Sequence, residues 1–129
     1  MSGKYLLDTN IVIALFAEDK SVQRRIATAE EIFIPATVIG ELFFGAFNSA
    51  NQRENMSRIE EFALFNAVLV SGVGTGKEYR RIKNTLKIKG SPIPENDIWI
   101  AALAMEHGLI LVTRDEHFTI IEGLKKATW

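Results

Sequence analysis

Short apolar runs alternate with helical patterns along this chain, and that alternation constrains the fold more than any other feature. Four runs have the length and side-chain content of buried strands, at residues 4–7, 31–34, 67–70 and 109–112. A weaker fifth candidate lies at residues 125–129. Strands that alternate with helices favour a parallel sheet covered by helices on both faces.

Helical periodicity fills the intervals between these runs. It predicts helices at residues 11–16, 21–29, 36–47, 51–65, 75–89 and 98–107. Pro35 suits the start of one helix, and Gly90 and Gly108 follow the ends of two others. The element order therefore predicts an α/β fold with a central parallel sheet of four or five strands. The helices at 51–65 and 75–89 can either pair as an arm or cover one end of the sheet.

Length and composition bound the kind of protein. At 129 residues we expect one domain spanning residues 1–129. The absence of cysteine excludes a disulfide scaffold, a thiol nucleophile and a zinc-thiolate site. Residues 1–5 lead into no apolar stretch of signal-peptide length, so we expect a cytoplasmic protein without membrane contact. The net charge of -1 means that nucleic-acid binding would need a local basic surface.

Acidic residues stand beside the ends of the predicted strands and the starts of the helices. Asp8 and Asp115 follow strands, and Asp97 precedes a helix. Each also suits a helix cap or a turn, which needs no site. Glu41 is different because it lies in an otherwise apolar helix, where a buried unpaired carboxylate would be costly, although an exposed position is the alternative.

A parallel sheet would bring these four acids together, because ligands of open α/β folds bind at the carboxyl ends of the strands. Crowded carboxylates raise each other's pKa unless a cation neutralises them. An all-oxygen cluster implies Mg²⁺ or Mn²⁺, ions that activate water and orient phosphodiesters. The acids therefore indicate nuclease chemistry.

Four segments carry these acids in ordered motifs. They read LLDTNI at 6–11, PATVIGEL at 35–42, PIPENDIWIAA at 92–102 and LVTRDEHF at 111–118. Together they resemble the motifs of PIN-domain ribonucleases, particularly the VapC-type toxins, over essentially the whole chain. The resemblance implies a three-layer α/β/α fold and a metal-dependent endoribonuclease.

The resemblance also implies roles for individual residues. Asp8, Asp97 and Asp115 would hold one or two ions of Mg²⁺ or Mn²⁺, while Glu41 positions or deprotonates the attacking water. Three neighbouring polar residues would support the site: Thr9, Asn10 and Thr113. The implied partners are an RNA substrate, a second copy in a homodimer and a VapB-type antitoxin whose tail blocks the acidic cleft.

Residues 77–89 are strongly basic, with Glu78 their only acid. Such a run is usually a solvated helix face, yet a nuclease also needs phosphate contacts, and both interpretations stand. The residues that would contact RNA are Arg80, Arg81, Lys83 and Lys87. The preceding glycine-rich segment departs from the Walker pattern at Ser71 and Glu78, which favours a strand-to-helix turn over a phosphate loop.

Other polar and aromatic residues receive no role from the sequence. His107 suits a helix end and His117 has no obvious ligand partner, so the sequence predicts that neither histidine binds a metal. Five phenylalanines can line a dimer or antitoxin groove, or belong to the core. They are Phe43, Phe44, Phe47, Phe62 and Phe65.

Three other function classes compete with the nuclease, and one of them, the haloacid-dehalogenase-like phosphatases, needs a second acid where Asn10 stands. A receiver-type phosphoacceptor domain needs paired acids at the first strand and an aspartate closing the third, where Ser71 and Gly72 follow Val70. A non-catalytic interaction module would use the acids only as helix caps. Glu41 is the residue that such a module explains least well.

Overall fold

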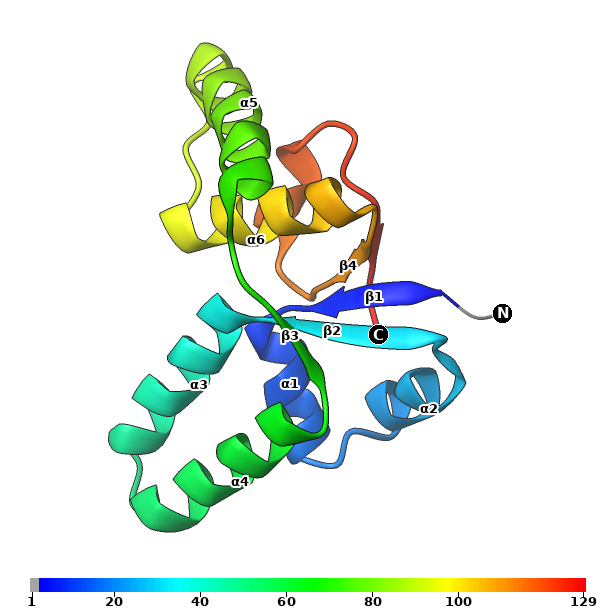
Figure 1. Cartoon of the computed structure of the whole chain (residues 1–129), viewed down its shortest axis with the longest axis vertical. Coiled ribbons are helices and arrows are strands. Elements are labelled where there is room, and N and C mark those ends of the chain that lie inside the picture. The colour runs from blue at the N-terminus through cyan, green and yellow to red at the C-terminus, as the bar shows by residue number, and fades with distance from the viewer. Residues whose placement is uncertain (1–2) are drawn as a thin grey trace.

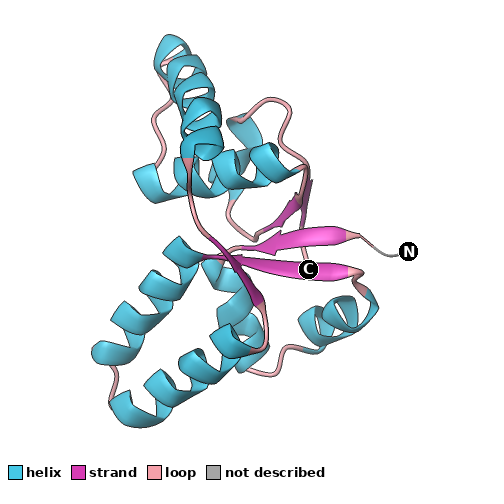
Figure 2. Cartoon of the chain, in the orientation of Figure 1, coloured by secondary structure: helices cyan, strands magenta, loops and turns pink. Residues whose placement is uncertain are grey.

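The computed structural model describes residues 3–129 and has a five-stranded sheet between two groups of helices (Figure 1 and Figure 2). The prediction of a cytoplasmic protein uses residues 1–5. Two of these residues, Met1 and Ser2, lie outside the described part of the chain. The predicted α/β fold with a parallel sheet is confirmed. None of the described helices is long and apolar enough to cross a membrane.

The sheet consists of parallel strands in the order β3-β2-β1-β4-β5. Their bounds are β1 Lys4–Leu7, β2 Glu31–Pro35, β3 Ala67–Leu69, β4 Ile110–Val112 and β5 Lys126–Ala127. The central strand β1 pairs with β2 on one side and β4 on the other, so Leu6 lies opposite both Phe33 and Leu111. The chain order reverses between β1 and β4, which is where open α/β sheets bind their ligands.

Helices cover both faces of the sheet. Their bounds are α1 Thr9–Phe16, α2 Lys20–Thr28, α3 Ala36–Phe47, α4 Gln52–Leu64, α5 Val73–Lys89 and α6 Glu95–His107. The helices α1 to α4 lie on one side of the sheet, and α5 and α6 lie on the other (Figure 1). The two helices whose pairing the sequence left open do not form one arm, because α4 packs against α3 and α5 packs against α6.

The core forms where the helices meet the central strands. The strand residues Leu6, Leu7 and Leu111 are completely buried. Phe118 is also completely buried, and it belongs to a short 3-10 helix, η1 Glu116–Ile120, that the apolar pattern did not predict. A buried phenylalanine anchors this short helix, because removing a large aromatic side chain from water contributes roughly 1.5–3 kcal/mol.

The start of α6 differs from the sequence prediction. The predicted helix began at residue 98, which made Asp97 a candidate cap, whereas α6 begins at Glu95 directly after Pro94. Pro94 has an extended backbone and cannot donate a main-chain hydrogen bond, so the helix starts at the next residue. Asp97 is therefore the third residue of α6, and the capping interpretation of Asp97 was wrong.

The glycine-rich segment is the start of α5, as the turn interpretation predicted. The backbone N–H of Gly72 donates to the Thr75 hydroxyl over 3.0 Å, and that buried hydroxyl donates to the carboxylate of Glu106 on α6. A Cβ at position 74 would clash with the same carboxylate. The carboxylate of Glu106, which belongs to the same chain, therefore lies against the start of α5.

Candidate active site

Asp8 lies at the end of β1, and the first turn of α1 begins directly after it. Its side chain is only 5% exposed. One carboxylate oxygen accepts a hydrogen bond from the backbone N–H of Thr9 at 2.8 Å. The other accepts from the Thr113 hydroxyl at 2.8 Å and from the Asn10 amide at 3.3 Å. Asp8 is therefore both a helix cap and part of a polar cluster that joins β1 to the end of β4.

Burial raises the pKa of Asp8 above its ordinary value of 3.8. Hydrogen bonds from Thr113 and Thr9 oppose the increase, and repulsion by the charges of Glu41 and Asp115 adds to it. A carboxylate in this setting gains free energy from a nearby cation, because a cation offsets both the lost hydration and the repulsion.

Asp97 approaches from α6, and its side chain is 16% exposed. Burial raises its pKa, and the charge of Asp8 raises it further, while a hydrogen bond from His117 acts in the opposite direction. Asp97 and Asp8 lie on different elements and far apart in the sequence. The charge of Asp8 nevertheless acts on Asp97, which is consistent with the first and third motifs lying near each other.

Asp115 comes from the loop after β4. Its backbone N–H donates to the Thr113 hydroxyl at 3.0 Å, and its carboxylate accepts from the backbone N–H of His117 at 2.9 Å, which caps η1. The imidazole Nδ1 of His117 lies 3.1 Å from Asp115 Oδ1 and 3.5 Å from Asp97 Oδ2. The sequence interpretation missed this contact because Asp97 lies on a separate helix.

Glu41 is partly buried on α3, between the buried and the surface positions that the sequence left open. Its carboxylate accepts a hydrogen bond from the Thr9 hydroxyl at 2.5 Å and another from the Asn96 amide at 3.2 Å. Each carboxylate oxygen thus has a donor from a different motif. Asn96 belongs to the third motif, but the sequence does not predict it as a site residue. Its position beside Asp97 at the start of a helix was the feature that could have identified it.

Arg114 holds the loop that carries Asp115. Its backbone N–H donates to the Asn10 side chain at 3.1 Å. Its guanidinium donates to the carbonyl oxygen of Trp129 and to the carboxylate of Asp19, each at 2.9 Å. The hydrogen bond from Arg114 lowers the pKa of Asp19. These contacts fix the fourth motif against the start of α2 and the segment after β5.

The donor set fits a divalent cation. Among residues 3–129, Asp97, Asp115 and His117 form one group whose possible ligand atoms all lie within 4.8 Å of one another. Asp8, which was predicted as a third ligand, is not in this group, although its charge acts on Asp97. Carboxylate oxygens and an imidazole nitrogen are ligands that divalent ions accept in proteins.

The predicted RNA-contact residues lie on α5, next to α6. Two of them are paired with acids: Arg81 with Glu78 at 3.1 Å, and Lys83 with Glu95. The other two, Arg80 and Lys87, are exposed and form no ion pair within the described part of the chain. The basic run is therefore partly neutralised by acids of its own chain.

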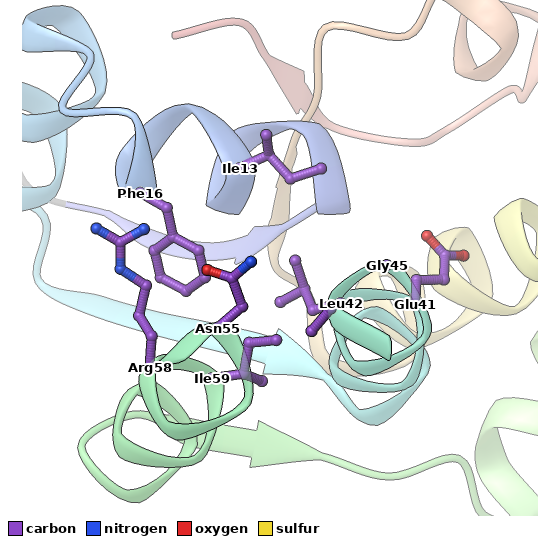
Figure 3. A pocket seen from close by; sticks show the side chains of 9 residues that line it. Ile13, Phe16, Glu41, Leu42, Gly45, Asn55, Arg58 and Ile59 are labelled. Atoms are coloured by element: carbon purple, nitrogen blue, oxygen red, sulfur yellow. The ribbon is translucent and has the colours of Figure 1, made fainter. Parts of the chain in front are cut away.

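A groove of about 240 Å³ runs between α1, α3 and α4 (Figure 3). Its walls are mostly apolar, with Ile13 and Phe16 from α1 and Leu42 from α3, and Glu41 also lines it. The Arg58 guanidinium lies 5.0 Å from the centre of the Phe16 ring.

None of the five phenylalanines considered in the sequence is among the residues that line this groove in the described structure. Phe43 and Phe62 pack on the core, while Phe44, Phe47 and Phe65 are exposed.

Comparisons with known proteins agree with this geometry. The PIN domain family profile matches residues 5–124. Ribonuclease VapC2 of Haemophilus influenzae is 33% identical over 129 residues, covering 98% of both chains. The structure of VapBC-1 from nontypeable Haemophilus influenzae matches with a TM-score of 0.88 and 30% identity, covering 98% of both chains. VapBC2 from Rickettsia felis, bound to a DNA fragment from their promoter, matches with a TM-score of 0.89 and 26% identity over 98% of both chains. The chain therefore belongs to the PIN domain family.

Proposed function

We propose that this protein is a metal-dependent endoribonuclease and the toxin of a VapBC-type toxin-antitoxin module. The observation that carries the proposal is the meeting of four motifs around one acidic site: Thr9 contacts Glu41, Thr113 contacts Asp8, and His117 contacts Asp97. Membership of the PIN domain family, with relatives named ribonuclease VapC, supports the same activity.

Asp8, Asp97 and Asp115 would hold Mg²⁺ or Mn²⁺, directly or through water. When bound, the ion supplies positive charge to the scissile phosphate and lowers the pKa of water. Asn10 and Thr113 hold the Asp8 carboxylate in place by hydrogen bonds. The polar cluster around Asp8 thus fixes one side of the site before any ion or substrate arrives.

Glu41 acts as the general base in this proposal. Hydrogen bonds from Thr9 and Asn96 orient its carboxylate, which accepts a proton from water. The water oxygen forms a bond to phosphorus, the bond from phosphorus to the 3′ oxygen breaks, and that oxygen takes up a proton. The products are a 5′-phosphate and a 3′-hydroxyl.

The antitoxin would occupy the groove between α1, α3 and α4. This groove is mostly apolar, has a volume of about 240 Å³ and is lined at one side by Glu41. A bound segment would therefore place an apolar face against the apolar wall and a basic residue beside Glu41. Structures of relatives that are VapBC complexes support a VapB-type partner. Exposed apolar residues outside the groove, Phe44 and Phe65 among them, offer area for a homodimer.

The test is cleavage of a labelled panel of structured RNAs by the purified protein with Mg²⁺, with Mn²⁺ and with a chelator. We expect cleavage that needs the ion and is lost in Asp8→Asn. Asp115→Asn serves as a second variant if Asp8→Asn fails to fold by circular dichroism, and Glu60→Gln, an exposed position on α4, is the matched control. Absence of both cleavage and metal binding in the wild type would favour the interaction module instead.

The receiver-type phosphoacceptor class has no support in the structure. A receiver-type domain needs an aspartate at the end of its third strand, and here Val70, Ser71 and Gly72 follow β3. The acids instead come from β1, α3, α6 and the loop after β4.

A further inference from the structure

His117 is held beside the acidic site by its neighbours in the chain. Its backbone N–H donates to Asp115, and the next residue, Phe118, is completely buried in the core. The imidazole itself is about half exposed, with 53% of the side chain accessible. The main chain therefore fixes where the ring lies, while the ring stays open to solvent and to ions.

The distances around the ring match those between ligands of one ion. Nδ1 lies 3.1 Å from an oxygen of Asp115 and 3.5 Å from an oxygen of Asp97. Ligand atoms bonded to one ion at about 2.1 Å lie roughly 3.0–3.4 Å apart, for octahedral and tetrahedral angles respectively. The two carboxylates and the imidazole can thus share an ion with small adjustments of their side chains.

We infer that His117 is a nitrogen ligand of the divalent ion, beside Asp97 and Asp115, and that this makes the site prefer Mn²⁺ to Mg²⁺. The inference rests on the proposed function and deepens it by assigning the kind of ion. Both ions prefer oxygen ligands, but Mn²⁺, as a first-row transition ion, also accepts an imidazole nitrogen, which Mg²⁺ rarely does. A nitrogen in the coordination shell therefore stabilises bound Mn²⁺ more than bound Mg²⁺.

The chain offers a clean spectroscopic test, because it has only two histidines. The full chain is labelled with ¹⁵N-histidine, loaded with Mn²⁺ and studied by pulsed electron paramagnetic resonance. We expect coupling between Mn²⁺ and a histidine nitrogen in the wild type and its loss in His117→Gln. His107→Gln is the matched control, because His107 contacts Glu106 at the far end of α6, and it should keep the coupling.

Affinity measurements give an independent readout. Loss of even an outer partner of a metal ligand costs roughly 10–100-fold in affinity. We expect at least a tenfold loss of Mn²⁺ affinity in His117→Gln, with a smaller loss for Mg²⁺, so that the Mn²⁺ to Mg²⁺ affinity ratio falls. His117→Asn, which offers an oxygen near the Nδ1 position, should recover Mg²⁺ binding better than Mn²⁺ binding.

The outcomes separate this inference from the proposed function. Mn²⁺ bound without histidine coupling, or an unchanged affinity ratio in His117→Gln, would overturn the nitrogen ligand while leaving a metal-dependent nuclease intact. A histidine that only donates a hydrogen bond to Asp97 and Asp115 would give that result. Binding of Mg²⁺ without binding of Mn²⁺ by the wild type would also overturn only the nitrogen ligand, whereas binding of neither ion would overturn both proposals together.

Discussion

The hydroxyl of Thr9 lies 2.5 Å from the carboxylate of Glu41, and it connects the first turn of α1 to the middle of α3. The two residues are 32 positions apart, and the strand β2 lies between them in the chain. Together with Asn96 from α6, Thr9 gives Glu41 a fixed orientation. In the proposed role of Glu41 as general base, a carboxylate held in this way would need no rearrangement before it accepts a proton.

Replacing Glu41 by Gln should abolish most of the RNA cleavage without unfolding the protein. Gln keeps the size of the side chain and an oxygen that accepts from Thr9, but it cannot take a proton. General-base catalysis contributes typically 10²–10⁴-fold, so we expect the cleavage rate to fall within about that range. Single-turnover cleavage of a labelled RNA measures the rate. Cleavage by Glu41→Gln at the rate of the Glu60→Gln control would contradict the role of Glu41.

Replacing Asn96 by Ala should slow cleavage while leaving RNA binding almost unchanged. The variant removes one donor to Glu41 and leaves the contact with Thr9, so it disturbs orientation but keeps the carboxylate. We expect kcat to fall by about tenfold, which corresponds to roughly 1.4 kcal/mol, and KM to stay close to the wild-type value. Asn84→Ala, at an exposed position of α5, is a matched control. A change confined to KM would indicate that Asn96 binds substrate instead.

Replacing Asp97 by Asn should stabilise the protein in the presence of a chelator. The pKa of Asp97 is raised in the folded state, so the folded protein binds more protons than the unfolded chain just above pH 3.8. Stability contributed by this group therefore falls as the pH rises through that window, and it stays low at neutral pH. The free energy of unfolding changes by at most about 1.4 kcal/mol per pH unit for each proton by which the folded and unfolded states differ.

Urea unfolding of the wild type and Asp97→Asn at a series of pH values measures this difference. Subtracting the two curves removes the acids that both proteins share. We expect the advantage of Asp97→Asn to grow as the pH rises above about 3.8 and then to level off. Adding Mn²⁺ should reverse the order at neutral pH, because only the wild type retains Asp97 as a ligand. An advantage that is independent of pH would contradict the raised pKa.

Replacing Thr75 by Val should destabilise the protein without changing the chemistry of the site. Valine has the shape of threonine, but it leaves the N–H of Gly72 and the carboxylate of Glu106 without the hydroxyl that joins them. Gly72 and Glu106 are exposed, so water can replace the lost hydroxyl, and we expect the free energy of unfolding to fall by about 0.5–1.5 kcal/mol, the net contribution of a typical hydrogen bond. Denaturant unfolding measures the loss, and the Thr85→Val variant of an exposed hydroxyl on the same helix is the control.

The sequence predicted the sheet and its helices because their apolar patterns have distinct periods. β1 was predicted with its observed bounds, and the ends of the helices differed by a few residues at most. η1 was missed because a helix of five residues shows too little periodicity to be recognised. The packing of Phe118 in the core, and not a local preference for helix, accounts for this element.

The site was only partly predictable for a related reason. Asp8 and Asp115 follow strands, so the rule for parallel sheets predicts that they share an edge. The contacts of Glu41 with Asn96, and of His117 with Asp97, depend on how α3, η1 and α6 are oriented over that edge. Side-chain contacts between helices that are far apart in sequence leave no periodic pattern, so the periodicity that predicts the helices does not predict these contacts.

The pairing of β1 with β4 determines when the site can exist during synthesis. The backbone N–H of Asp8 donates to the carbonyl of Val112 at 3.0 Å, and its carboxylate accepts from Thr113, 105 positions later in the chain. A nascent chain that has not yet released β4 from the ribosome lacks both contacts, as well as Asp115. Translation that stops before Asp115 therefore yields fragments without an assembled site.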